Sequence, residues 1–177
     1  WGSQEDYGNL GLNNRTNYSS PVQIPGTWSR LSAARFQGYG IKTDGTLWAW
    51  GAGLHGELGL NNLTKYSSPV QIPGTTWDDI ASSQVTVATK TDGTLWSWGY
   101  GGQGELGLND RTNRSSPTQV GSDTTWTSVQ ANWNHVMAFK SDGTLWNWGH
   151  NSSGMLGQNN RTEYSSPVQV PGTTWSK

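Results

Sequence analysis

Short apolar segments bounded by turn residues recur along the whole chain, and they predict strands rather than helices. Residues 39–42 and 47–50 lie on either side of Asp44 and Gly45. Asp-Gly between two apolar segments is typical of a type I′ hairpin turn, in which both central residues have positive φ. We therefore predict that residues 39–42 pair with residues 47–50 across a turn at this dipeptide.

Two further segments of the same stretch have the character of strands. Residues 28–34 form an extended run, and residues 22–24 form a short strand that follows Pro21 and ends at Pro25. Together with the hairpin, these segments give about four short strands in roughly 50 residues.

The strand at residues 47–50 is apolar on both faces. It reads Leu-Trp-Ala-Trp, and alternation along a strand places Leu47 and Ala49 on one face and the two tryptophans on the other. Such a strand is expected to lie between two neighbouring sheets. The Trp-x-Trp pattern occurs three times, and we predict that its six tryptophans form the structural core: Trp48, Trp50, Trp96, Trp98, Trp146 and Trp148.

The same sequence phrases return in the same order, so the chain is a tandem repeat. Trp-Gly begins each unit, and Gly-x-Leu-Gly, Ser-Ser-Pro, a Thr-Trp pair and Asp-Gly-Thr-Leu-Trp-x-Trp follow. We place three full units at 1–49, 50–97 and 98–147, and a partial fourth unit at 148–177. The hairpin turns of the full units are predicted at Asp44 and Gly45, Asp92 and Gly93, and Asp142 and Gly143.

Four short strands per unit are typical of one blade of a β-propeller, and we predict an all-β propeller of four-stranded blades with about 3.5 units in this chain. The composition agrees with this fold. The 177 residues include 24 glycines and 12 tryptophans, whereas leucine, isoleucine, valine and phenylalanine together number 28. Tryptophan therefore supplies much of the apolar area, at about 150–250 Å² per side chain, and glycine supplies many tight turns.

The phrases Trp-Gly, Gly-x-Leu-Gly, Ser-Ser-Pro-Val-Gln, Thr-Thr-Trp and Lys-Thr-Asp-Gly-Thr-Leu-Trp resemble the regulator of chromosome condensation repeat, in its bacterial and phage version. The resemblance covers the whole chain. It implies a β-propeller, usually of seven blades, of which this chain would be about half. Family units often carry Gly and then His after the Thr-Trp pair. Here the Gly position holds Ala34, Ser83 or Asn132, and the His occurs only as His135.

Charge and composition argue against several classes of function. Eleven Lys and Arg against twelve Asp and Glu leave a net charge of −1, without a basic block for nucleic acid. No apolar run reaches the roughly 18 residues of a membrane helix, and the lack of cysteine excludes disulfides and thiolate sites. We predict no nucleic-acid partner and no membrane insertion. Richness in Asn, Ser, Thr and Gly favours an extracellular, virion-surface or cell-surface location.

Motifs that could bind a cofactor or a metal have simpler explanations. Gly-x-Gly-x-x-Gly at 51–56 and 99–104 lacks the following helix that a dinucleotide site requires, and the repeated Asp of Asp-Gly serves the turn itself. His55, His135 and His150 occupy different positions in their units and lack zinc-site spacing. We predict no cofactor, no metal and no catalytic residue, and hence a protein that is not an enzyme.

Positions that differ between units are free to face a partner, because the shared positions carry the fold. The most variable stretches are the loop after Trp-Gly and the segment after the Thr-Trp pair. They contain residue types enriched at the centres of interfaces, and we select as candidate binding residues Tyr7, Arg35, Phe36, His55, Tyr100, Trp133, His135 and His150.

We therefore predict an interaction or structural module of a virion, fibre or cell surface, which binds a protein or a surface glycan through variable loops. The alternatives are a carbohydrate-binding lectin and, by family analogy only, a regulator of guanine-nucleotide exchange. An open arc of blades would also expose an apolar face at each end. Leaving a face of on the order of 500 Å² exposed to water loses about 12 kcal/mol of hydrophobic stabilisation. We therefore expect further repeats of the same chain, or self-association, to cover both faces.

Overall fold

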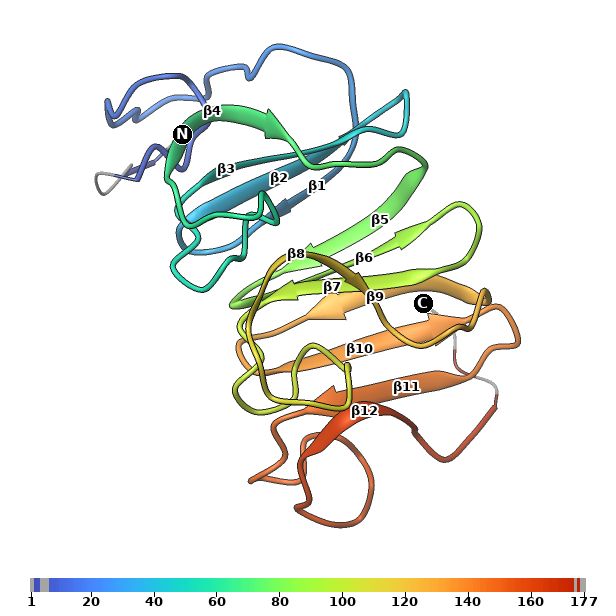
Figure 1. The fold of residues 1–177 in the computed structure, drawn as a ribbon. Helices are drawn as coiled ribbons and strands as arrows, with labels where there is room; N and C mark the ends of the chain where they lie inside the picture. The colour runs from blue at the N-terminus through green and yellow to red at the C-terminus, as the bar shows by residue number, and fades with distance from the viewer. Residues whose placement is uncertain (1, 4–6, 174, 176–177) are drawn as a thin grey trace.

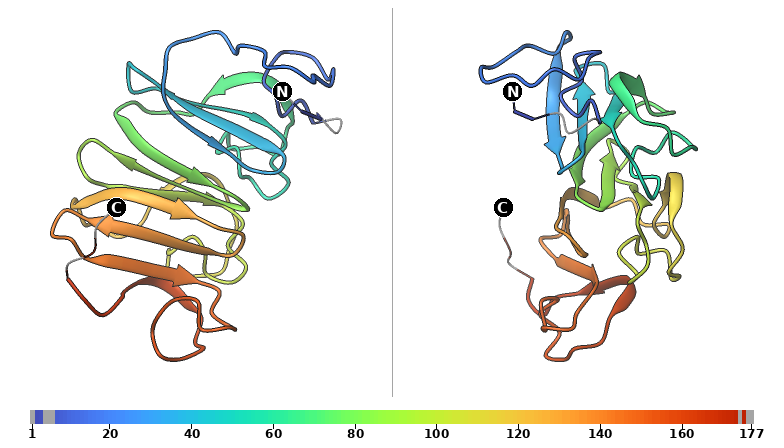
Figure 2. Two further views of the ribbon diagram at one scale, coloured as in Figure 1. Left: turned by 180° about the vertical axis from the view of Figure 1, so that it is seen from behind. Right: turned by 90° about the vertical axis from the view of Figure 1, so that its left-hand side faces the viewer.

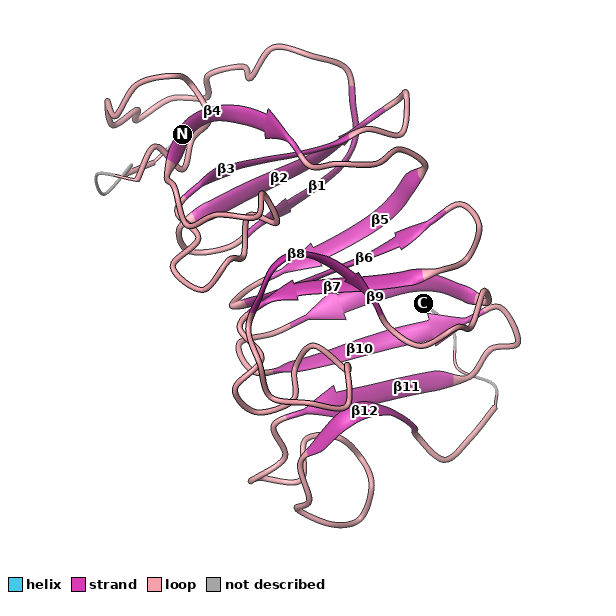
Figure 3. Cartoon of the chain, viewed as in Figure 1, coloured by secondary structure: helices cyan, strands magenta, loops and turns pink. Residues whose placement is uncertain are grey.

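The computed structural model describes residues 2–3, 7–173 and 175, and every regular element in this part of the chain is a β-strand (Figure 3). The strands fall into three groups of four. The first group is β1 (Trp28–Ala33), β2 (Gln37–Lys42), β3 (Leu47–Gly51) and β4 (Tyr66–Gln71). The second is β5 (Trp77–Ser82), β6 (Val85–Lys90), β7 (Leu95–Gly99) and β8 (Arg114–Gln119). The third is β9 (Trp126–Ala131), β10 (His135–Lys140), β11 (Leu145–Gly149) and β12 (Tyr164–Gln169).

Each group forms one antiparallel sheet whose strands lie side by side in chain order. The three sheets stack face to face as an arc of blades (Figures 1 and 2). The first strand of the middle blade, β5, packs against the first strands of both neighbours, β1 and β9. The predicted all-β fold of four-stranded blades is confirmed.

The hairpin between β2 and β3 pairs the two predicted segments, but its turn is not the type I′ turn that we expected. Gly45 has a φ of 79°, whereas Asp44 is not among the residues with positive φ. The Gly45 N–H donates to the Lys42 carbonyl, and the Lys42 N–H donates to the Thr46 carbonyl. This is a three-residue loop, a type I turn closed by a left-handed glycine.

The side chain of Asp44 explains the difference. Its Oδ1 accepts both the N–H of Thr46, at 3.0 Å, and the hydroxyl of Thr46, at 2.6 Å, and these two bonds lower the pKa of Asp44. An aspartate that bonds two residues ahead stabilises the turn by itself and leaves positive φ to the glycine. The turns at Asp92 with Gly93 and at Asp142 with Gly143 repeat this arrangement.

Residues 22–24 do not form a strand, contrary to our prediction. In the repeat register, Gly2 and Tyr18 correspond to Gly51 and Tyr66, and an antiparallel bridge joins each pair. The strand that follows such a bridge pairs with residues just before Trp-Gly, as β4 pairs with β3. No such strand lies beside residues 22–24 in the described part of the chain. Without a partner strand, this segment has no ladder of hydrogen bonds to hold it.

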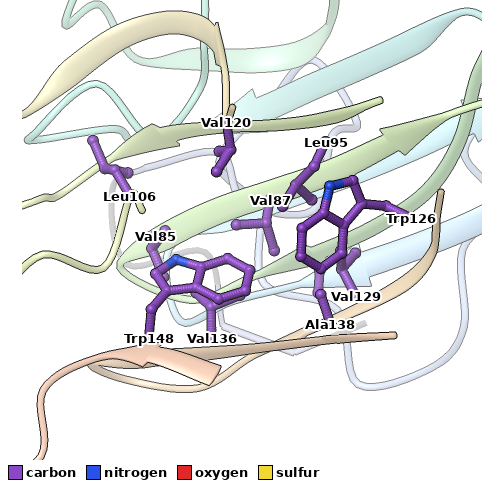
Figure 4. Close-up of a cluster of buried hydrophobic side chains, with 11 residues drawn as sticks. Val85, Val87, Leu95, Leu106, Val120, Trp126, Val129, Val136, Ala138 and Trp148 are labelled. Atoms are coloured by element: carbon purple, nitrogen blue, oxygen red, sulfur yellow. The ribbon is translucent and has the colours of Figure 1, made fainter. Parts of the chain in front are cut away.

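The core lies between the blades. At the junction of the second and third blades, aliphatic side chains of one blade pack on tryptophans of the next (Figure 4). Val85, Val87 and Leu95 come from the second blade, and Trp126 and Trp148 come from the third. The junction of the first and second blades has the same plan. Packing between neighbouring blades therefore buries the apolar side chains of the core.

The two tryptophans of each Trp-x-Trp pair have different surroundings. Trp98 is fully buried, and its indole N–H donates to the Glu57 carbonyl, in a loop of the preceding blade, at 2.7 Å. Trp50 and Trp148 make equivalent bonds. The other members of the pairs are half-buried, and each has a lysine ammonium 3.9–4.3 Å from its ring centroid: Trp48, Trp96 and Trp146.

The first blade exposes an apolar position that the other blades bury. Leu31 is 68% exposed, whereas Ile80 and Val129, which take the same place opposite the second strand, are 6% and 1% exposed. The neighbouring blade covers both of these side chains. Among the described residues, none forms a helix that is long and apolar enough to cross a membrane.

Candidate functional site

The loops that vary between units gather at one end of the arc, on the left-hand side of Figure 1. Main-chain hydrogen bonds join the loop after each Trp-Gly to the turn between the first and second strands of the same blade: Ala52 to Phe36, Tyr100 to Gln84 and His150 to Asn134. The three Asp-Gly hairpins lie at the opposite end. We call the first end the loop rim, comprising residues 34–37, 52–57, 83–84, 100–105, 132–134 and 150–155. Variable loops on a constant scaffold are a common place for binding sites.

A groove of about 200 Å³ opens on the loop rim. Residues of all three blades line it, and we call it the rim groove: Arg35, Phe36, Gln37, Leu54, His55, Glu57, Ser83, Gln84 and Trp133. Two large apolar side chains at this groove face solvent, since Leu54 is 53% exposed and Trp133 is 57% exposed. Two exposed apolar side chains at one groove form an apolar surface that a partner can cover.

One wall of the rim groove continues into a stack of aromatic and cationic side chains. The Arg35 guanidinium lies 4.6 Å from the ring centroid of Phe36, and the Tyr7 ring lies 4.8 Å from the same ring. The Lys65 ammonium lies 4.4 Å from the Tyr7 ring. The stack presents positive charge beside the apolar groove.

The opposite wall is anchored to the core. The Glu57 carboxylate accepts the main-chain N–H of His55 at 2.8 Å, and the Glu57 carbonyl accepts the buried Tyr39 hydroxyl at 2.6 Å. The His55 ring contacts the Tyr100 ring, with centroids 5.2 Å apart. The loop that carries Leu54 is therefore held in place before any partner arrives, which reduces the entropic cost of binding.

His135 and His150 lie in a separate polar cluster on the third blade. His150 Nδ1 is 2.8 Å from a Glu163 carboxylate oxygen, and His150 Nε2 is 2.6 Å from the Ser152 hydroxyl. Arg111 holds the other oxygen of Glu163 at 3.0 Å. Burial, helped by the nearby His150, lowers the pKa of His135. This cluster ties the loop at 150–155 to its neighbours.

Glu105 is a buried acid at the junction of the second and third blades, where its carbonyl accepts the indole N–H of Trp148. It is fully buried; one carboxylate oxygen accepts the Gln103 N–H at 2.8 Å, and the other has no hydrogen-bond partner among the described residues. Burial raises the pKa of Glu105 because it penalises the charged form.

The structure thus divides the eight candidate residues into three sets. Arg35, Phe36, His55 and Trp133 line the rim groove, Tyr7 and Tyr100 stack on its walls, and the two remaining histidines lie apart. Sequence reasoning missed Leu54, although it falls in the variable loop after Trp-Gly that signalled His55. No group of three or more His, Asp or Glu that could hold a metal ion occurs in the described part of the chain.

The sequence matches the Regulator of chromosome condensation (RCC1) repeat over residues 44–86, 92–139 and 142–175. The chain belongs to the RCC1 repeat family. The predicted resemblance to this family is thereby confirmed, while its bacterial or phage character stays a prediction. A search of curated proteins found no match.

Solved RCC1-like propellers share the fold. Human WBSCR16 superposes with a TM-score of 0.80 at 19% identity, over 93% of this chain and 45% of that chain. Prp20p from Saccharomyces cerevisiae, described with its binding to Gsp1p and histones, superposes with a TM-score of 0.76 at 16% identity, over 95% and 45%. Yeast RCC1 (Prp20) bound to Kap60 gives 0.81 at 17% identity, over 98% and 44%. The chain therefore spans less than half the length of these proteins.

Proposed function

We propose that this RCC1-repeat chain is an interaction module that binds a protein partner through the rim groove. The observation that carries the proposal is the convergence of two solvent-exposed apolar side chains, Leu54 and Trp133, from different blades on one groove. Tryptophan, arginine and aromatic residues in such positions are the usual anchors of protein interfaces. The relative Prp20p, the yeast RCC1, is described with its binding to Gsp1p and histones and in a structure bound to Kap60, so binding of a protein has a parallel in this family.

The expected partner is a peptide segment that offers an apolar side chain to the groove and a negative charge to the stack of Arg35, Phe36, Tyr7 and Lys65. A location on a virion, fibre or cell surface rests on composition and remains part of the proposal. So does the division of the chain into units at 1–49, 50–97, 98–147 and 148–177.

The test is selection of a phage-displayed peptide library on the wild-type chain, followed by titration of the recovered peptides. Trp133→Ala and Leu54→Ala are expected to weaken binding by at least about tenfold, because each removes an anchor worth about 2 kcal/mol. The matched control is Trp175→Ala, which removes an equally large side chain that is 43% exposed and lies near the opposite end. Equal binding by Trp133→Ala and the wild type would refute the rim groove as the site.

The exchange-factor alternative is tested in the same way. Release of labelled guanine nucleotide from a small GTPase should be unchanged by the chain. Acceleration that is lost in Trp133→Ala would instead identify nucleotide exchange as the activity of the rim groove.

A further inference from the structure

A second kind of cavity recurs in register at the blade junctions, away from the rim groove. One cavity of about 460 Å³ is lined by Asn13, Gln23, Trp28 and Trp48. Another, of about 390 Å³, is lined by the corresponding residues of later units: Asn109, Gln119, Trp126 and Trp146. We call the second one the junction pocket. Both volumes lie in the range of small-molecule sites, about 300–1,000 Å³.

Trp126 lines the junction pocket, and its buried indole N–H has no acceptor among the described residues. Nine tryptophans occupy the repeated positions of the three blades, and seven of them donate their indole N–H to a protein oxygen. Trp126, which is 4% exposed, and Trp77 have no acceptor among the described residues. In the first blade, the corresponding Trp28 donates to the Ile24 carbonyl at 3.3 Å. A buried donor without a partner is costly, so the junction beside this pocket is less well satisfied than the corresponding place in the first blade.

The charge at the junction pocket is already neutralised. Lys140 lies 4.6 Å from the Trp126 ring and 4.1 Å from the Trp146 ring, and its ammonium forms a 2.6 Å ion pair with Asp123. The lysine is therefore engaged on three sides and is not available to attract an anion. Asp123 lines the pocket and retains a second carboxylate oxygen.

We propose that the junction pocket binds a neutral saccharide unit. A sugar hydroxyl can donate to the carboxylate of Asp123, and the amides of Asn109 and Gln119 can both donate and accept. The half-buried Trp146 offers an aromatic surface for the apolar face of a sugar ring. An aromatic surface surrounded by amide and carboxylate groups fits a ligand with many hydroxyls and no charge. This site is independent of the proposed protein-binding function of the rim groove.

The experiment screens neutral and charged mono- and oligosaccharides on an array, then titrates the hits while recording the indole ¹⁵N–¹H signals of the tryptophans. The Trp126 signal is assigned by its loss in Trp126→Phe. A neutral saccharide is expected to bind with a Kd of about 1 mM or tighter and to shift the Trp126 and Trp146 signals, with Trp50 and Trp98 unchanged. Gln119→Ala should weaken binding about tenfold.

Two variants serve as controls. Gln130→Ala changes an exposed glutamine on β9 outside the junction pocket, and Trp133→Ala changes the rim groove. Both should bind the saccharide as the wild type does, so a failed rim groove would not affect this result. The proposal is wrong if no neutral saccharide shifts the Trp126 signal, if only charged saccharides bind, or if Gln119→Ala binds normally.

Discussion

At the scale of the residue, one repeated loop position is bonded through both its main chain and its side chain. The second tryptophan of each Trp-x-Trp pair donates its indole N–H to a loop carbonyl, as Trp98 does to Glu57 across a blade junction. For Trp98 and Trp148 the residue that offers this carbonyl is a glutamate, and its carboxylate closes the loop by accepting a main-chain N–H two residues before it. The loop is thus fixed by both its main chain and its side chain. The cost is a carboxylate held away from water, which is largest at Glu105.

Glu105→Gln is expected to raise the stability of the chain at neutral pH. The native state raises the pKa of Glu105, so its contribution is most favourable below the pKa of the unfolded chain and is lost as the pH rises through the native pKa. Glutamine keeps an oxygen for the Gln103 N–H and removes the buried charge. The melting temperature of the variant should exceed that of the wild type at pH 7, and the difference should shrink toward pH 4. Glu57→Gln serves as the comparison, because it makes the same substitution at the equivalent loop position one blade earlier. A variant less stable than the wild type at pH 7 would contradict the argument.

At the scale of the element, each second strand ends in a lysine that packs between two tryptophans. Lys90, the last residue of β6, lies 4.7 Å from the Trp77 ring and 4.3 Å from the Trp96 ring. The lysine therefore joins the first strand of a blade to the third across the second. It explains why the first tryptophan of each Trp-x-Trp pair is half-buried rather than in the core.

Replacement of these lysines by methionine tests this role. Lys90→Met should cost about 0.5–2 kcal/mol, because methionine keeps the apolar stem and loses the cation–π contacts. Lys140→Met should cost more, by up to about 1 kcal/mol, because Lys140 also pairs with Asp123 at 2.6 Å. Urea unfolding at low and high salt measures both. The difference in the free energy of unfolding between the two variants should become smaller at high salt. Equal losses of unfolding free energy at low salt would show that the ion pair contributes nothing.

At the scale of the whole molecule, the first blade leaves an apolar position of one face open to solvent. The second and third blades bury Ile80 and Val129 against a neighbouring blade, while the first blade leaves Leu31 open. The same face that makes a junction inside the arc is therefore available for association outside it.

We predict that the 177-residue chain self-associates as its concentration rises, and that Leu31→Glu weakens this association. Covering one leucine side chain is worth about 1.5–3 kcal/mol, so the dissociation constant should rise about 10- to 100-fold. Sedimentation velocity over a concentration series measures the change. Leu63→Glu, at a loop position that is 60% exposed, is the control and should associate as the wild type does. A chain that stays monomeric throughout, or an equal effect of both variants, would contradict the prediction.

The sequence by itself determined the all-β fold and its repeat of four-stranded blades, because the repeat places the same turn and apolar signals in every unit. Asp44 and Gly45 marked the hairpin, and alternation along residues 47–50 marked a strand buried on both faces. It also singled out four residues of the rim groove, because variation between units exposes positions that the fold does not constrain. Local pattern did not determine the turn type at Asp44, which depends on a side-chain bond to Thr46, or the loss of the strand at 22–24, which depends on a partner strand.

Only the tertiary structure decided which distant residues meet. It brought Leu54 beside Trp133 across two blade junctions, left the Trp126 N–H without an acceptor, and placed Lys140 between two indoles. These outcomes depend on how one blade rests on the next, a contact between residues about 50 positions apart in the sequence. A periodic sequence specifies each blade, whereas the spaces between blades arise from packing and differ wherever the repeat is imperfect.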